Sequence, residues 1–151
     1  MLEYASTRKV SASAACKIQE EIGAIRRTWW RGAIGLEAEE RDTPSILSGS
    51  TPLFHPPGLI PDEDDLFLAF GDAAYIAERL ADWSKRFTIK WRLAMNGDDW
   101  GAIDASGLSP QFLGQMDKWA RRAKVAPAGK GSWSVPEERR ASLLRKYETR
   151  R

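Results

Sequence analysis

The stretch FTIKWRLAMNGDDWGAID, residues 87–104, carries the clearest structural signal in this 151-residue sequence. From Phe87 to Met95, apolar side chains alternate with polar or small ones, which is the period-two pattern of a half-buried β-strand. Asn96-Gly97 then supplies the residues that a tight hairpin turn prefers. We therefore predict a strand over 87–96, a turn, and a return strand over 100–104.

The segment before this hairpin predicts a further strand and a helix. The apolar run Leu66–Phe70 ends at a glycine and fits a buried strand, and Asp72 fits the N-cap of an amphipathic helix over 73–86. An alternative remains open, because Pro61 followed by four acidic residues also resembles the start of a helix.

Three more helices are predicted from capping residues and apolar spacing. Ser109-Pro110 begins a helix that extends to about residue 124. Apolar residues at three- and four-residue spacing predict an amphipathic helix over 12–27, which packs on the domain or, in a homodimer, on the same helix of a second subunit. A capping-box spacing predicts a basic C-terminal helix over 134–148.

Together these elements predict one α+β domain over residues 1–151. Its centre, about residues 66–124, has the order β-α-β-β-α, flanked by the N-terminal amphipathic helix and the C-terminal basic helix. Residues 32–61 are rich in proline, glycine and serine and predict a long irregular segment. Residues 125–151 are predicted to form a basic C-terminal arm.

Charge is distributed very unevenly along the chain, although the net charge is only +2. Residues 37–72 hold nine acidic residues and one basic residue, whereas residues 118–151 hold eleven basic and three acidic residues. Such a basic terminal segment is typical of chains that bind nucleic acid or an acidic protein surface. The opposite charge of residues 37–72 offers a second interpretation, in which the C-terminal helix folds back on the acidic stretch.

The residue types exclude several common kinds of site. One histidine and one cysteine cannot build a structural zinc site, and no phosphate-binding loop or dinucleotide fingerprint matches the sequence. We therefore predict no cofactor, no metal and no catalytic residues. No apolar run approaches the length of a membrane span, and a single cysteine forms no internal disulfide, so the expected location is the cytoplasm.

Tryptophan is the most unusual feature of the composition, with seven residues. Trp83, Trp91 and Trp119 occupy inward positions of their predicted elements and are expected in the core. Trp30 and Trp133 do not fit the core pattern and lie among basic residues. Aromatic and basic side chains together suit a protein interface or a stacking platform for nucleic acid. The candidate binding residues are Trp30, Arg31, Arg121, Arg122, Lys124, Lys130, Trp133, Arg139 and Arg140.

Three functional classes follow from these observations, and they are not equally favoured. The favoured one is a non-enzymatic protein–protein interaction module, such as an adaptor, an inhibitor or an immunity-type partner. The first alternative is a nucleic-acid-binding protein that uses its basic C-terminal segment. The second alternative is an enzyme built on carboxylates, for which Asp62, Glu63, Asp64 and Asp65 are the densest acidic run.

Overall fold

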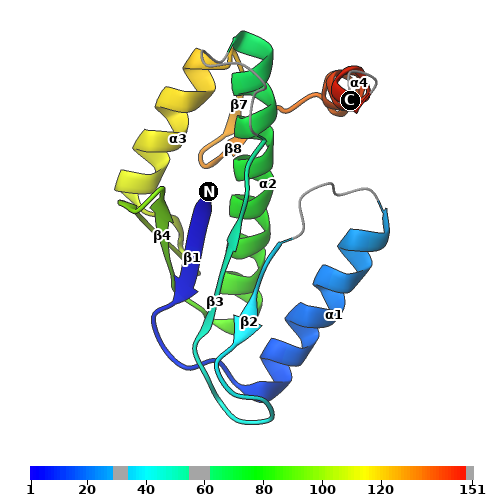
Figure 1. Ribbon diagram of the computed structural model, residues 1–151. Helices are drawn as coiled ribbons and strands as arrows, with labels where there is room; N and C mark the ends of the chain where they lie inside the picture. Colours follow the sequence, from blue (N-terminus) through cyan, green and yellow to red (C-terminus); the bar gives the residue numbers. More distant parts are fainter. Residues whose placement is uncertain (29–33, 55–61, 149–151) are drawn as a thin grey trace.

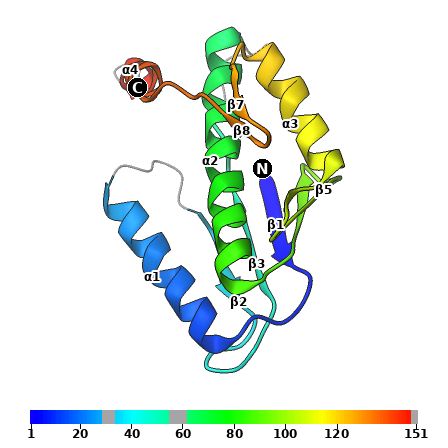
Figure 2. The ribbon, with the colours of Figure 1, turned by 180° about the vertical axis from the view of Figure 1, so that it is seen from behind.

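Six strands in the described part of the chain form one antiparallel sheet in the order β2-β3-β1-β4-β5-β6. The structure is a computed structural model that describes residues 1–28, 34–54 and 62–148. Helix α2 runs across one face of the sheet, with α1 and α3 on either side (Figures 1 and 2). This arrangement confirms the predicted class, a single α+β domain.

The elements have the following bounds. The six strands of the sheet are β1 (Leu2–Ser6), β2 (Glu37–Ala38), β3 (Leu47–Thr51), β4 (Trp91–Met95), β5 (Asp98–Asp104) and β6 (Gly107–Leu108). A separate hairpin consists of β7 (Pro127–Gly129) and β8 (Ser132–Trp133). The helices are α1 (Ala12–Thr28), α2 (Glu63–Phe87), α3 (Pro110–Arg122) and α4 (Glu137–Glu148).

The predicted central hairpin is confirmed as β4 and β5. Asn96 and Gly97 connect the two strands, and both have positive φ (51° and 89°), as a tight hairpin turn requires. Strand β4 is shorter than predicted, because α2 extends to Phe87 and Thr88 caps it in the left-handed conformation. Along β4 the inward side chains are buried while Arg92 is exposed, so the alternation does mark the two faces of the sheet.

The prediction of a strand over Leu66–Phe70 is wrong, because these residues belong to helix α2. Asp62 is the N-cap and forms a capping box with Asp65, so the helix begins after Pro61, as the alternative interpretation proposed. Asp72, which we predicted as an N-cap, lies inside α2. A short apolar run fits a buried strand and a buried helix equally well, and only the capping residues distinguish them.

Strands β1 and β3 were not predicted, so the order β-α-β-β-α does not describe the centre of the sheet. Strand β1 lies between β3 and β4, and β3 falls within the predicted irregular segment 32–61. The chain crosses itself closely there, since a Cβ atom at Gly49 would overlap the carbonyl oxygen of Gly35. Glycine permits this approach because it has no side chain.

The outer helices largely follow the predictions. Helix α1 confirms the amphipathic helix over 12–27, and its stripe residues Ile18 and Ile22 are buried against the domain. Helix α3 begins at the Ser109 N-cap as predicted. Helix α4 starts three residues later than predicted, at Glu137. None of the helices in the described part of the chain is both long and apolar enough to cross a membrane.

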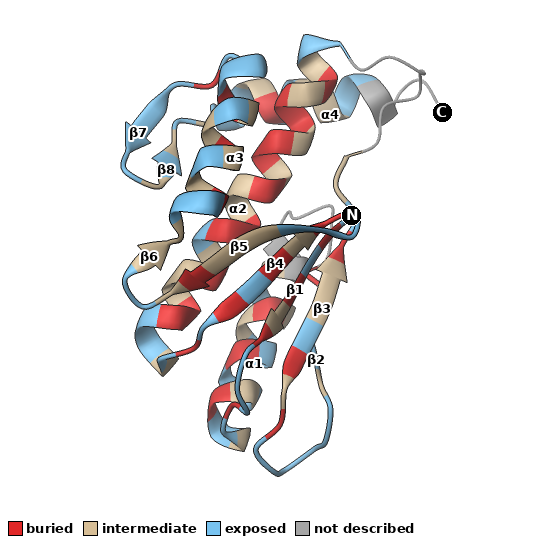
Figure 3. Cartoon of the chain, turned by 90° about the vertical axis from the view of Figure 1, so that its left-hand side faces the viewer, coloured by how far each residue is buried: buried red, intermediate tan, exposed pale blue. Residues whose placement is uncertain are grey.

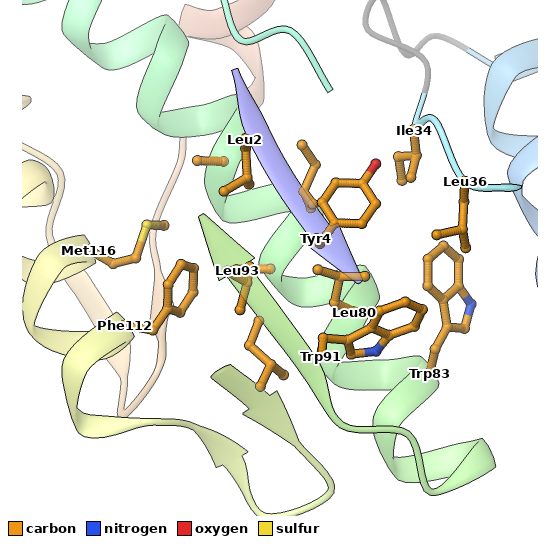
Figure 4. Close-up of a cluster of buried hydrophobic side chains, with 14 of the residues drawn as sticks. Leu2, Tyr4, Ile34, Leu36, Leu80, Trp83, Trp91, Leu93, Phe112 and Met116 are labelled. Atoms are coloured by element: carbon orange, nitrogen blue, oxygen red, sulfur yellow. The ribbon is translucent and has the colours of Figure 1, made fainter. Parts of the chain in front are cut away.

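The core lies between the sheet and its helices. Leu2 and Leu93 of the strands are buried in one cluster with Leu80 of α2 and with Phe112 and Met116 of α3 (Figure 4). Trp83 and Trp91 are completely buried, which confirms two of the three tryptophans predicted in the core. Figure 3 shows the buried side of α2 and of the strands in red, with exposed residues along the outer helix faces.

Candidate interaction site between α2 and the C-terminal arm

The basic C-terminal arm folds back on the acidic start of α2. Arg139 Nη2 lies 3.1 Å from Asp64 Oδ1 and 3.9 Å from Glu63 Oε1. Arg140 Nη2 donates to Asp72 Oδ1 at 2.6 Å. These contacts confirm the charge-based prediction that the C-terminal helix binds the chain's own acidic stretch, and Figure 2 shows α4 beside the upper half of α2.

The Arg140–Asp72 pair is the buried contact of the arm. The Arg140 side chain is 4% exposed and the Asp72 side chain 13% exposed. The second carboxylate oxygen of Asp72 accepts the backbone N–H of Phe54 at 2.9 Å, so this carboxylate joins α2, α4 and the segment after β3. The stem of Arg140 passes over Gly71, where a Cβ atom would lie 3.7 Å from Cδ of Arg140.

The remaining charged contacts of the arm lie nearer the surface. The guanidinium of Arg139 sits 4.1 Å from the centre of the Phe67 ring, a cation–π arrangement. Just before the arm, Lys124 Nζ lies 3.1 Å from Glu63 Oε2. The acidic run 62–65 is therefore engaged within the chain, because Asp62 and Asp65 form the capping box while Glu63 and Asp64 face basic side chains.

A groove of about 390 Å³ runs beside this contact. Helix α2 forms one wall, and β6, the hairpin of β7 and β8 and the start of α4 form the other. We call this the α2 groove. Small residues of α2, including Gly71, Ala74 and Ala81, line it together with the larger Tyr75 and Arg79. The opposite wall consists of Leu108, Gly131, Ser132, Trp133 and Val135. Glu137 and Arg140 of α4 also line the groove.

Trp133 links the α2 groove to an aromatic cluster. Its indole N–H donates to Asp117 Oδ1 at 3.1 Å, and its ring meets Phe70 edge-on at 5.5 Å. The cluster continues to Trp119 and Trp100, with ring centres 5.7 Å apart for Phe70–Trp119 and 6.0 Å apart for Trp100–Trp119. Trp133 is thus half-buried and held in place, with part of its surface left to line the groove.

The structure divides the residues that the sequence analysis selected. Trp30 and Arg31 lie outside the described residues. Arg121, Arg122 and Lys130 are exposed. The other selected residues contact the chain itself: Lys124, Trp133, Arg139 and Arg140.

Two residues of the α2 groove were not selected from the sequence, namely Tyr75 and Arg79. Burial raises the pKa of the Tyr75 phenol, which indicates a partly desolvated position. The Arg79 guanidinium carbon lies 5.9 Å from the centre of the Tyr75 ring, and its Nη2 lies 3.7 Å from Glu78 Oε1. The available signal was the spacing of small residues on α2, which becomes meaningful only once 63–87 is recognised as one helix.

Metal binding finds no support in the described part of the chain, where no group of three or more histidine, cysteine or acidic side chains is placed to hold an ion. No family model, no curated protein and no solved structure matches the sequence. What the α2 groove does must therefore be argued from its own chemistry.

Proposed function

We propose that this chain is a non-enzymatic protein-binding module whose contact surface is the α2 groove. The observation that supports this is the presence of Trp133, Tyr75 and Arg79 around one groove. Tryptophan, tyrosine and arginine carry most of the binding energy in protein interfaces, particularly where they are partly desolvated and held in place. All three side chains here are half-buried.

The shape of the groove suits side chains of a protein partner. Its lining includes Ala74 and Ala81, whose short side chains let a partner approach the α2 backbone. Trp133 is already fixed by its hydrogen bond to Asp117 and its contact with Phe70, so little side-chain entropy is lost when a partner covers it.

A pair of matched variants tests this proposal. Ala74→Arg fills the groove, and Ala24→Arg makes the same change at an exposed position of α1. The wild type and both variants are used for quantitative affinity capture from cells that express the chain, after circular dichroism has shown that all are folded. We expect a protein that the wild type and Ala24→Arg retain equally and that Ala74→Arg loses.

The affinity for the captured protein then gives the decisive number. Ala74→Arg and Tyr75→Ala are each expected to raise Kd by about tenfold or more, which corresponds to about 1.4 kcal/mol. The proposal fails if no protein is enriched over the background, or if Ala24→Arg weakens binding as much as Ala74→Arg does.

Nucleic-acid binding is the second candidate, supported by the exposure of Arg121, Arg122 and Lys130. Six phosphate contacts with a duplex would give a log–log slope of affinity against salt of about −5. Because Lys124, Arg139 and Arg140 face acidic side chains of α2, we expect about three contacts and a slope near −3. Titration with a mixed-sequence oligonucleotide at several salt concentrations measures the slope, and a slope near zero excludes this candidate.

A further inference from the structure

Helix α4 docks on α2 mainly through charged side chains. It has 12 residues, and isolated helices of that length are marginal in water. Leu143 and Leu144 are its partly buried apolar side chains, whereas Ala141, Ser142 and Arg145 are exposed. Its docking therefore depends strongly on the contacts of Arg139 and Arg140 with acidic residues.

The surface beneath α4 continues directly into the α2 groove. Gly71, Val135 and Arg140 border both, because Arg140 crosses α2 at Gly71 while also lining the groove. On α2, Asp64, Gly71 and Glu78 are spaced by seven residues and so lie along one side of the helix. From Asp64 to Asp82 this side of α2 is about 27 Å long. Helix α4 covers only the part near the N-terminal end of α2.

The charge of this side of α2 indicates what it binds. Its N-terminal part carries Glu63, Asp64 and Asp72, and Glu78 and Asp82 line the groove further along. In the groove, Glu78 and Asp82 already pair with Arg79 and Arg86 of α2. The acidic residues that an occupant must meet are therefore those that α4 now contacts, and a segment that replaces α4 there must be basic.

Helix α4 itself shows how such an occupant is recognised. Adjacent arginines reach two separate carboxylates, Asp64 and Asp72, and the first of them also covers the Phe67 ring. Arginine suits both contacts because its planar guanidinium pairs with carboxylates and stacks on aromatic rings.

We propose that the partner of this module presents a basic helix with adjacent arginines, which displaces α4 from Asp64 and Asp72 and continues into the α2 groove. This inference rests on the proposed function, since the groove is part of the same binding surface. Helix α4 is then an internal competitor. As a tethered segment it acts at an effective concentration of the order of mM, so only a helix that binds the emptied surface far more tightly than mM replaces it.

The test uses the full chain and a labelled, end-capped peptide of residues 134–148 as the probe. The variant Arg139→Glu/Arg140→Glu repels α4 from α2 and empties the surface. The control Arg121→Glu/Arg122→Glu changes the net charge equally at exposed positions of α3. Fluorescence anisotropy is expected to show peptide binding to the emptied variant with a Kd at least about tenfold lower than for the wild type or the control.

A second set of variants keeps the result interpretable. If the double variant does not fold, Arg139→Glu alone removes a half-exposed arginine and leaves the buried Arg140–Asp72 pair intact, with the same direction of effect expected. Adding Glu63→Lys and Asp64→Lys to the emptied variant is expected to abolish peptide binding. The inference is overturned if a folded, emptied variant does not bind the peptide, or binds it no better than the wild type does.

The two proposals fail in different ways. Glu63→Lys/Asp64→Lys changes the acidic residues that α4 contacts, whereas Ala74→Arg changes the α2 groove, so peptide binding to the emptied variant tests the first surface and capture of the partner by the intact chain tests the second. If the peptide binds and Ala74→Arg still captures the partner, the groove function is wrong while the α4 surface stands. If the peptide does not bind and Ala74→Arg loses the partner, the α4 inference is wrong while the groove function stands.

Discussion

Replacing Arg140 with methionine should destabilise the fold by about 3–5 kcal/mol, because it removes one partner of a buried ion pair. The Arg140 side chain is 4% exposed, and its Nη2 lies 2.6 Å from a carboxylate, that of Asp72, which is itself 13% exposed. With charge centres about 4 Å apart and an effective dielectric constant of about 20, their attraction is about 4 kcal/mol. Methionine retains the unbranched stem over Gly71, so the loss is mainly electrostatic.

Urea unfolding followed by tryptophan fluorescence measures this change. The free energy of unfolding of small proteins falls by about 1–3 kcal/mol per M of urea, so a loss of about 3–5 kcal/mol lowers the midpoint of the urea transition by at least about 1 M. The control is Arg145→Met, an exposed position of the same helix, which should change stability by no more than about 0.5 kcal/mol.

A double-mutant cycle separates the charge from the packing. Asp72→Asn keeps an oxygen for the N–H of Phe54 while removing the negative charge. The double variant Arg140→Met/Asp72→Asn buries no charge at this position. We therefore expect its free energy of unfolding to be less than about 2 kcal/mol below that of the wild type and higher than that of Arg140→Met. A loss below about 1 kcal/mol for Arg140→Met, or a double variant no more stable than the single one, would refute this reasoning.

Three further predictions concern the core, the groove and the response to pH. Trp91→Ala should cost about 3–5 kcal/mol in the same urea assay, since this ring is completely buried. Trp133→Ala should cost about 2 kcal/mol, the sum of one hydrogen bond to Asp117 and one edge-on contact with Phe70; a change within about 0.5 kcal/mol would mean that the ring is not held. Burial raises the pKa of Tyr4 to about 12, so the contribution of Tyr4 to stability should be constant below about pH 10 and fall by about 1.4 kcal/mol per pH unit between about pH 10 and 12, where only the unfolded phenol ionises. Absorbance titration of tyrosinate together with urea unfolding above neutral pH checks this, and Tyr4→Phe should make the fall in stability between about pH 10 and 12 less steep, leaving the contribution of Tyr75.

The elements that were predicted correctly are those whose signals are local. The hairpin of β4 and β5 follows from alternation and from Asn96-Gly97, and α3 follows from the Ser109 N-cap. Strands β1 and β3 gave weaker signals, because each is short and is stabilised by pairing with residues far away in the chain. The run Leu66–Phe70 was assigned to the wrong element because a short, unbroken apolar run has no periodicity that distinguishes a strand from a helix.

The candidate site was predictable in its chemistry and not in its geometry. The uneven charge left two interpretations open, binding of an external ligand or contact with the chain's own acidic stretch, and Arg139 and Arg140 were selected as candidate binding residues. The structure pairs both arginines with acidic residues of α2. Which carboxylates they meet depends on the register of α4 against α2, which no local pattern encodes. Tyr75 and Arg79 became candidates only when the fold placed them opposite Trp133.

The sequence by itself determined what depends on neighbours along the chain: the amphipathic helix α1, helix α3 with its Ser109 N-cap, the central hairpin, the α+β class and the opposite charges of two segments. Tertiary structure alone decided the order of the six strands, the half-buried position of Trp133, the burial of the Arg140–Asp72 pair and the α2 groove. The physical reason is that these features arise where distant segments exclude water together, and the free energy of that burial depends on which surfaces meet.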